Sequence, residues 1–298
     1  IESAFGVPAA LSGAVMTAMM AIILFGGIRR LAAVSEVVVP AMVIGYLVLA
    51  IWVLILNFTD IPRAIALIFS SAFGLEEAVG GGVAAAVAQG ARRGLFSNEA
   101  GLGTVPNVAA AADVPHPMSQ GLVQSLSVFI DTVILCTATA LIILMSSVYG
   151  SDGQTVQGVV LTQMAVAEHL GPIGEPLVSI ALVLFATTTI AYNAFLGENS
   201  IAYFERLGRW AVPVFRISVL VMIAWASVQD LGTVFGFADL TMALLALTNL
   251  LALWAVYPVA ISLLRHFEQQ LEAGVAPQFS RDEMPEEALD PASWPSEQ

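Results

Sequence analysis

Long apolar stretches recur along this chain, and they limit what it can fold into more than any other feature. Several stretches of roughly 20 apolar residues are each long enough to cross a bilayer as an α-helix. Only 11% of the 298 residues are charged, whereas soluble domains carry about 25%. Within a bilayer, helices satisfy all of their own backbone hydrogen bonds. The sequence therefore predicts an all-α membrane protein that crosses the bilayer several times.

Seven spanning segments are expected, of which the third is interrupted. They cover about residues 9–28, 37–57, 85–113, 117–148, 173–205, 210–228 and 236–264. Residues 157–170 are interpreted as a helix lying in the membrane interface. Residues 1–266 then form the transmembrane domain, and the acidic, Pro-rich residues 267–298 predict a disordered tail.

Charge orients the spans, because cytoplasmic loops carry an excess of basic residues. The arginines that close the first, fifth and seventh spans are Arg29, Arg30, Arg206, Arg209 and Arg265. The opposite loops carry Asp60, Glu76, Glu77, Asp152 and Asp230. We therefore expect the arginine-rich loops and the C-terminal tail on the cytoplasmic side.

The third span contains the most unusual segment, residues 92–107, which reads RRGLFSNEAGLGTVPN. Gly101 and Gly103 allow backbone angles that other residues resist, and Pro106 lacks a backbone donor. Irregular backbone at membrane depth is tolerated where it is buried in protein or lines a cavity, and secondary transporters bind solutes and ions at such broken helices. The alternative is a tight loop between two spans.

Residues 92–122 and 128–144 closely resemble the alanine or glycine:cation symporter family. The segments FGGIRRLAAVSEVVVP (25–40) and ADLTMALLALTNLLAL (238–253) are similar to that family too. The resemblance covers nearly the whole chain up to about residue 270.

This resemblance implies a leucine-transporter-type bundle of two inverted repeats, of which this chain would hold a part with about seven transmembrane helices. The missing N-terminal helices of the same protein would include a second broken helix. The implied function is a sodium-coupled symporter for alanine or glycine in a bacterial inner membrane. An ion channel and a non-transporting membrane fragment are the alternatives.

Substrate binding is expected at the break and at two intramembrane polar residues. The residues are Asn98, Glu99, Ala100, Gly101, Leu102, Gly103, Thr104, Asp131 and Asn249. Intramembrane polar residues are costly and are functional candidates by default. Asp131 has the alternative of a structural carboxylate bonded to a neighbouring helix, and Asn249 that of a hydrogen bond between helices.

A sodium site is expected in the fifth span. On one helix face, the carbonyl of Phe185 and the hydroxyls of Thr188 and Thr189 present three oxygen ligands. In the resembled fold a sodium site uses two such adjacent hydroxyls. The alternative is that these hydroxyls bond back to the preceding helical turn.

Other chemistry is not indicated. Cys136 is the single cysteine and excludes a disulfide framework, and His116, His169 and His266 are too scattered in the sequence to suggest a metal site. There is no basic patch for nucleic acid, no nucleophile–base pair and no nucleotide motif, so neither an enzyme nor a cofactor other than the coupling sodium ion is expected. The lipid bilayer is the remaining expected partner.

Overall fold

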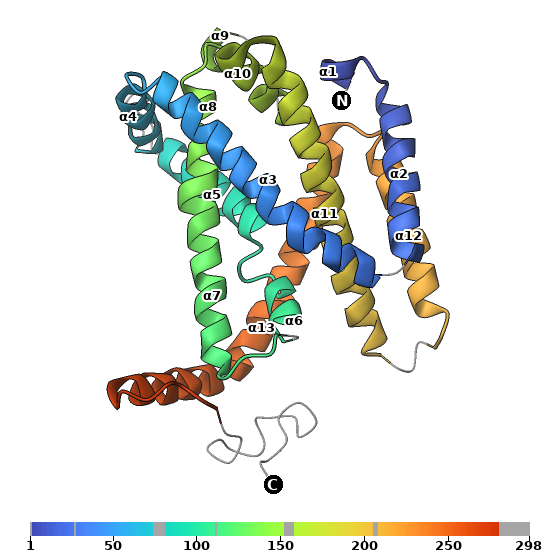
Figure 1. Ribbon diagram of the computed structural model, residues 1–298, viewed down its shortest axis with the longest axis vertical. Coiled ribbons are helices and arrows are strands. Elements are labelled where there is room, and N and C mark those ends of the chain that lie inside the picture. Colours follow the sequence, from blue (N-terminus) through green and yellow to red (C-terminus); the bar gives the residue numbers. More distant parts are fainter. Residues whose placement is uncertain are drawn as a thin grey trace. The chain divides into compact units, whose positions relative to one another are not determined.

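A computed structural model describes residues 2–26, 28–73, 81–110, 112–151, 158–204 and 208–279 (Figure 1). The helices are α1 (Glu2–Phe5), α2 (Ala9–Gly26), α3 (Ile28–Leu56), α4 (Ile61–Ala72), α5 (Gly81–Asn98), α6 (Thr104–Ala109), α7 (Pro117–Phe129), the π-helical η1 (Ile130–Cys136), α8 (Thr137–Leu144), α9 (Val148–Ser151), α10 (Val159–Leu170), the 3-10 turn η2 (Gly171–Ile173), α11 (Gly174–Ala202), α12 (Ala211–Ala226) and α13 (Leu231–Glu272). These residues contain no strand, which confirms the all-helical class.

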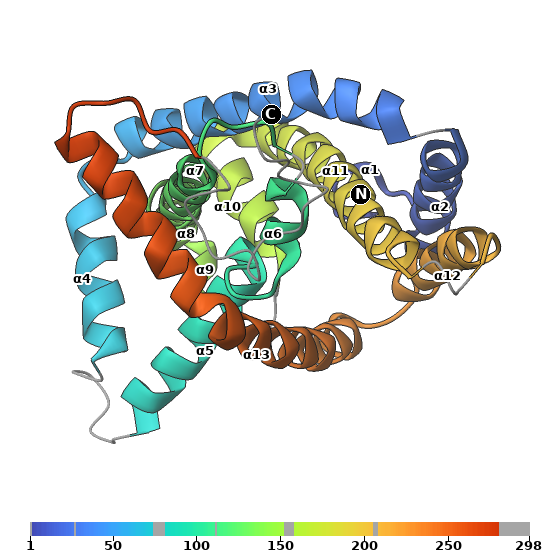
Figure 2. The ribbon, with the colours of Figure 1, turned by 90° about the horizontal axis from the view of Figure 1, so that it is seen from below.

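The chain divides into two compact units. Unit 1 comprises Ile1–Gly90 with Ile134–Ala238, and unit 2 comprises Ala91–Val133 with Asp239–Gln298. In unit 1 the long helix α11 packs on α3, α10, α12 and α2, and α12 also packs on α2. Figures 1 and 2 both show α2 beside α12.

Two apolar clusters hold unit 1 together. The first joins α3, α8, α10 and α11 through the buried residues Ala50, Val53, Ala138, Ile142, Ala165, Val166 and Val178. The second joins α2 and α11 through Met20, Leu24, Ala191 and Ala194, with α12 packed against it. Because α10 buries Ala165 and Val166 in the first cluster, this helix, expected in the membrane interface, is also part of the packed core.

A polar contact and a close helix approach join α10 to α11. The buried Gln163 of α10 donates a hydrogen bond to Ser179 of α11 at 2.7 Å. A Cβ at Gly174, the first residue of α11, would lie 2.6 Å from the carbonyl oxygen of Val166. Glycine is therefore required where the chain turns from α10 into α11.

The expected spans are reproduced in part. Five helical stretches of the described residues are long and apolar enough to cross a membrane: Ala9–Gly26, Val37–Leu56, Pro117–Leu144, Val159–Ala202 and Leu231–Glu272. The expected sixth span corresponds to α12. With 16 residues, α12 is apolar but shorter than these five stretches. The third span is divided into α5 and α6. The count of seven and the inverted-repeat arrangement stay predictions.

The last helix continues past residue 266, where the sequence predicts the end of the transmembrane domain. α13 ends at Glu272, and the backbone amides of Gln278 and Phe279 donate hydrogen bonds to the Gln270 side chain and the Pro115 carbonyl oxygen. The boundary between the transmembrane domain and the tail stays a prediction. The predicted loop residues Glu76, Glu77, Asp152 and Arg206, and the tail from 280 onward, lie outside the described residues.

Candidate functional site: the break between α5 and α6

The helix break expected in the third span is present in unit 2. α5 ends at Asn98 and α6 begins at Thr104. Between them Glu99, Gly101 and Gly103 take φ angles of 51°, 82° and 87°, and Glu99 is the only non-glycine residue with positive φ in the described chain. A left-handed conformation is unfavourable for a residue with a Cβ. Such strain persists where the surroundings hold it and is frequent at functional sites.

Asn249 of α13 braces this break. Its side-chain amide donates a hydrogen bond to the Gly101 carbonyl oxygen at 2.8 Å. A Cβ on Gly103 would lie 2.7 Å from the Asn249 side-chain oxygen. Asn249, which the sequence predicted either as a ligand-binding residue or as a link between helices, therefore contacts the irregular backbone directly.

The last two residues of α5 are tied to the π-helical segment η1. Ser97 donates a hydrogen bond to the Asp131 carboxylate at 2.8 Å, and Thr132 donates to the Asn98 side-chain oxygen at 3.0 Å. π-helical turns are rare and are frequent at functional sites. The Asp131 carboxylate, costly in a membrane span when it stands alone, thus accepts a hydrogen bond from the end of the broken helix.

Thr104, the first residue of α6, carries a buried hydroxyl without a hydrogen-bond partner in the described structure. Its neighbour Leu102 is only 2% exposed. A buried polar atom without a partner carries a desolvation cost of about 1–3 kcal/mol. The break therefore combines one unsatisfied buried hydroxyl with strained backbone.

The residues expected to bind sodium lie in unit 1 on α11. The Thr188 hydroxyl lies 3.0 Å from the Phe185 carbonyl oxygen and 3.1 Å from that of Leu184. These are the hydrogen bonds to the preceding turn that the sequence left as the alternative. They use the hydroxyl proton, and oxygen lone pairs of Thr188 and Phe185 remain for a cation. Thr189 is exposed.

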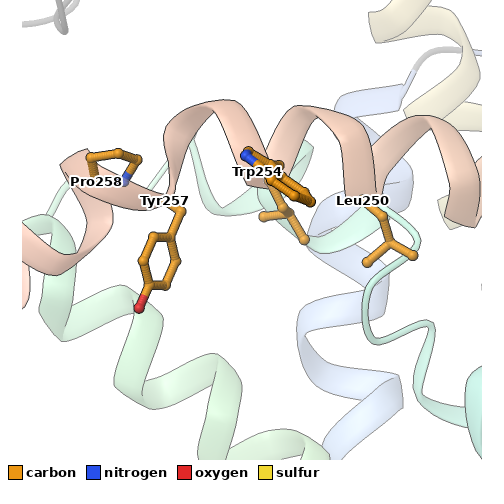
Figure 3. Close-up of a pocket in the computed structure, with 5 residues that line it drawn as sticks. Leu250, Trp254, Tyr257 and Pro258 are labelled. Atoms are coloured by element: carbon orange, nitrogen blue, oxygen red, sulfur yellow. The ribbon is translucent and has the colours of Figure 1, made fainter.

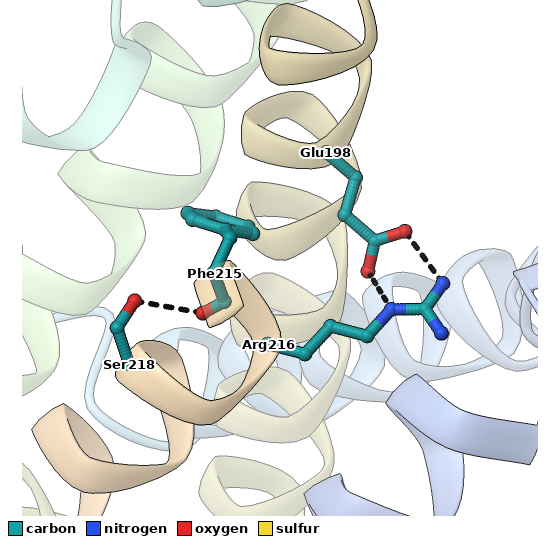
Figure 4. A network of polar contacts seen from close by, with 4 residues as sticks. All are labelled: Glu198, Phe215, Arg216 and Ser218. Carbon is teal, nitrogen blue, oxygen red and sulfur yellow. Dashed lines mark hydrogen bonds and ion pairs between the residues drawn. The ribbon is translucent and has the colours of Figure 1, made fainter. Parts of the chain in front are cut away.

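An ion pair on α11 and α12 was missed by the sequence analysis. The Arg216 guanidinium donates two hydrogen bonds to the Glu198 carboxylate, at 2.7 and 2.8 Å (Figure 4). Arg216 also stacks over the Phe25 ring of α2, 5.6 Å from its centroid. The signal was present, because both are charged residues inside expected spans, but their spacing of 18 residues does not itself indicate contact.

Two of the three histidines lie together in unit 2, although they are far apart in the sequence. The ring nitrogens of His116 and His266 are 3.1 Å apart, and His116 is fully buried. Gln270 contacts His266 and also pairs with the backbone of Gln278. Among the described residues there is still no group of three metal-ligating side chains.

α13 also carries an apolar hollow of about 420 Å³ around its internal Pro258 (Figure 3). Leu250, Trp254 and Tyr257 lie on one helix face along it. Trp254 is 84% exposed and Tyr257 63% exposed within the described chain. These aromatic residues are therefore surface residues of unit 2.

Comparison with known proteins identifies the family of this chain. The model of the sodium:alanine symporter family matches residues 1–281. The chain belongs to this family. This confirms the resemblance stated on the motifs around the break, and together with the long apolar helices it identifies a multi-pass membrane protein of a transporter family.

Individual relatives agree with this assignment. An uncharacterized transporter of Haemophilus influenzae is 42% identical over 89% of this chain and 56% of its own length. The amino-acid carrier protein AlsT of Bacillus subtilis is 38% identical over 96% of this chain and 60% of its own length. The probable sodium/glutamine symporter GlnT of the same organism is 37% identical over 94% of this chain and 58% of its own length. The chain thus spans a little under two thirds of the length of these relatives. The expectation of upstream helices stays a prediction.

Proposed function

We propose that this chain is part of a symporter that couples inward sodium movement to the uptake of a small neutral amino acid, alanine or glycine. The observation that carries the proposal is the break between α5 and α6, with its strained Glu99 and the unpartnered buried hydroxyl of Thr104. The family supports sodium and an amino acid as the transported species. One relative is named a probable sodium/glutamine symporter, so glutamine is included as a substrate to test.

The break offers complementary groups for an amino acid. The C-terminal end of the 18-residue α5 attracts positive charge, and so does the nearby Asp131 carboxylate, which would favour a substrate ammonium group or a cation. The Thr104 hydroxyl is a donor for a carboxylate. Asn98, Glu99, Ala100, Gly101, Leu102 and Gly103 supply the irregular backbone, which Asn249 holds in place. Substrate binding would thus depend largely on backbone groups that glycine makes accessible.

Sodium would bind separately on α11. The Phe185 carbonyl and the Thr188 hydroxyl already lie at a separation suited to two ligands of one ion, and Thr189 follows on the same helix. The hydroxyl proton must then turn away from the carbonyl, because a cation is bound by lone pairs. Neutral oxygen ligands suit a monovalent alkali cation, since they add no net charge at membrane depth.

The test is uptake by the complete protein in proteoliposomes. Radiolabelled alanine, glycine and glutamine would be offered with an inward sodium gradient, with a proton gradient alone, and with neither. We expect saturable accumulation that requires sodium and is strongest for alanine or glycine. Accumulation driven by a proton gradient alone would identify the proton, not sodium, as the coupling ion. Ohmic sodium currents without accumulation would establish a channel instead.

A further inference from the structure

A second feature of unit 2 lies beside the break and is not explained by it. A pocket of about 330 Å³ is formed between α5 and α13, within the range of about 300–1,000 Å³ typical of small-molecule sites. α5 contributes Arg92 and Leu95, and the break contributes Leu102. α13 contributes Asp239 together with a wall that includes Ala243 and Ala246.

Helical spacing explains why these residues share a pocket. Arg92 and Leu95 are three residues apart on one face of α5, and Asp239, Ala243 and Ala246 occupy one face of α13 at i, i+4 and i+7. The chain runs in the same direction on both sides of the pocket, because Arg92 and Asp239 line it together while Gly101, beyond the end of α5, contacts Asn249 nine and ten residues later. At helical rise this is about 15 Å.

The pocket is therefore polarised. Among the residues that each helix contributes to the pocket, the charged one comes first in the sequence. The apolar pocket residues follow it toward the break. Neither Arg92 nor Asp239 forms an ion pair or a side-chain hydrogen bond with any residue that the structure describes. A guanidinium and a carboxylate thus line one small pocket without pairing with each other. Arg92 is exposed and Asp239 is half-buried, so both charges are accessible, and a ligand carrying both charges would pair with each of them.

We propose that this pocket binds a zwitterionic amino acid, with Arg92 holding its carboxylate and Asp239 its ammonium group. Guanidinium groups recognise carboxylates by paired, charge-assisted hydrogen bonds. The small side chains of Ala243 and Ala246 leave room for a short apolar substrate side chain. Leu102 of the break, only 2% exposed, lines the same pocket, so the amino acid would be held beside the break. The choice of ligand rests on the proposed function.

The experiment measures binding and transport separately in the complete protein. Equilibrium binding of radiolabelled alanine in sodium chloride would be compared between wild type, Arg92→Gln and Asp239→Asn. Each substitution should weaken alanine binding by about tenfold or more, because a charge-assisted hydrogen bond is lost. Arg93→Gln is the matched control, since Arg93 is the next residue of α5 and does not line the pocket.

Two analogues show whether each residue contacts the ligand. Alaninamide lacks the carboxylate, so its competition with alanine in wild type and in Arg92→Gln should give the same inhibition constant. N-acetylalanine lacks the ammonium group and should be equally insensitive to Asp239→Asn. Equal losses for alanine and alaninamide in Arg92→Gln would show that Arg92 acts only structurally. Unchanged alanine binding in both variants would also overturn the proposal.

The outcomes separate this proposal from the proposed function. Sodium-driven uptake with unchanged binding in both variants rejects the pocket and keeps the symporter. Alanine binding that depends on both residues, without uptake by wild type, keeps the pocket and rejects the symporter. An absence of any amino-acid binding by wild type rejects both.

Discussion

Arg216 of α12 and Glu198 of α11 form a two-point ion pair, with hydrogen bonds of 2.7 and 2.8 Å. The Glu198 side chain is only 9% exposed and that of Arg216 23%. Both lie in helices of the second apolar cluster, and Arg216 covers the Phe25 ring of α2. The pair therefore joins α11 to α12, and the Arg216 guanidinium also contacts Phe25 of α2. The second apolar cluster holds the same three helices together.

Removing one partner of this pair should destabilise unit 1. Glu198→Gln or Arg216→Gln leaves a charge without its counterion, which costs about 3–5 kcal/mol in a fully buried pair. Because Arg216 is partly exposed, we expect roughly 2 kcal/mol. Thermal unfolding in detergent, followed by size-exclusion chromatography, measures the loss. Arg209→Gln, at an exposed arginine stacked on Trp210, is the control, and an equal melting temperature in all variants would contradict the expectation.

Gly103→Ala should abolish uptake while membrane insertion stays normal. The φ angle of 87° is unfavourable for alanine, and the new Cβ would clash with the Asn249 side chain. Two effects are therefore combined. The double variant Gly103→Ala with Asn249→Ala relieves the contact but also loses the hydrogen bond of Asn249 to the Gly101 carbonyl oxygen, so Asn249→Ala alone is its control. We expect this double variant to remain inactive, because the backbone strain persists. Uptake assays with a measure of surface abundance test this, and full activity of Gly103→Ala would mean that the break adopts another conformation.

Substitutions at Asp131 and Ser97 separate a structural carboxylate from a binding one. If Asp131 serves only to hold α5, Ser97→Ala should reduce uptake as much as Asp131→Ala, because either change removes the 2.8 Å hydrogen bond. We expect instead that Asp131→Ala abolishes sodium-dependent uptake while Ser97→Ala retains most of it. Initial rates at several alanine and sodium concentrations make the comparison. Similar losses in Asp131→Ala and Ser97→Ala would assign Asp131 a structural role.

Thr188→Val with Thr189→Val should raise the sodium concentration needed for half-maximal uptake by about tenfold. The valines keep the shape of the side chains and remove both hydroxyl ligands. Thr187→Val is the matched control, because Thr187 bonds to the Val183 carbonyl and contacts Met16 rather than the expected ion ligands. Sodium titration of uptake measures the shift, and an unchanged sodium dependence in the double variant would refute the site.

Gln270→Ala should release the segment that follows α13. The Gln270 side chain exchanges two hydrogen bonds with the backbone of Gln278, at 2.7 and 2.9 Å. Without them, the amide hydrogens of the segment around Gln278 should exchange faster in hydrogen–deuterium exchange. Gln269→Ala, on the preceding residue of the same helix, is the control. Equal exchange in both variants would show that the hydrogen bond from the Phe279 backbone N–H to the Pro115 carbonyl oxygen is sufficient to hold the segment.

The break was predictable because its signals are local. Gly101, Gly103 and Pro106 each act on their own backbone, so the interruption of the third span follows from a window of a few residues. The prediction of a helix at 157–170 was likewise reproduced by α10. Span lengths were less accurate, since helix ends depend on capping and packing, and α13 extends well beyond its apolar part to Glu272.

The contacts around the site were not predictable in the same way. Asn249 was singled out as polar, but its bond to Gly101 joins residues 148 positions apart. The pairing of His116 with His266 spans 150 positions, and distance in the sequence led to the opposite expectation. Asp239 lies near the start of the expected seventh span, and nothing in its sequence position indicates that it lines one pocket with Arg92, 147 positions away.

The amino-acid sequence by itself determined that the chain forms membrane-spanning helices, where one of them breaks, and to which family it belongs. These properties depend on hydropathy, on glycine and proline backbone preferences, and on contiguous motifs. Only the tertiary structure decided which side chains hold the break, that Glu198 and Arg216 neutralise each other, and that Arg92 and Asp239 line one pocket. Those relationships arise when separate helices pack side by side, and packing depends on all of their surfaces at once.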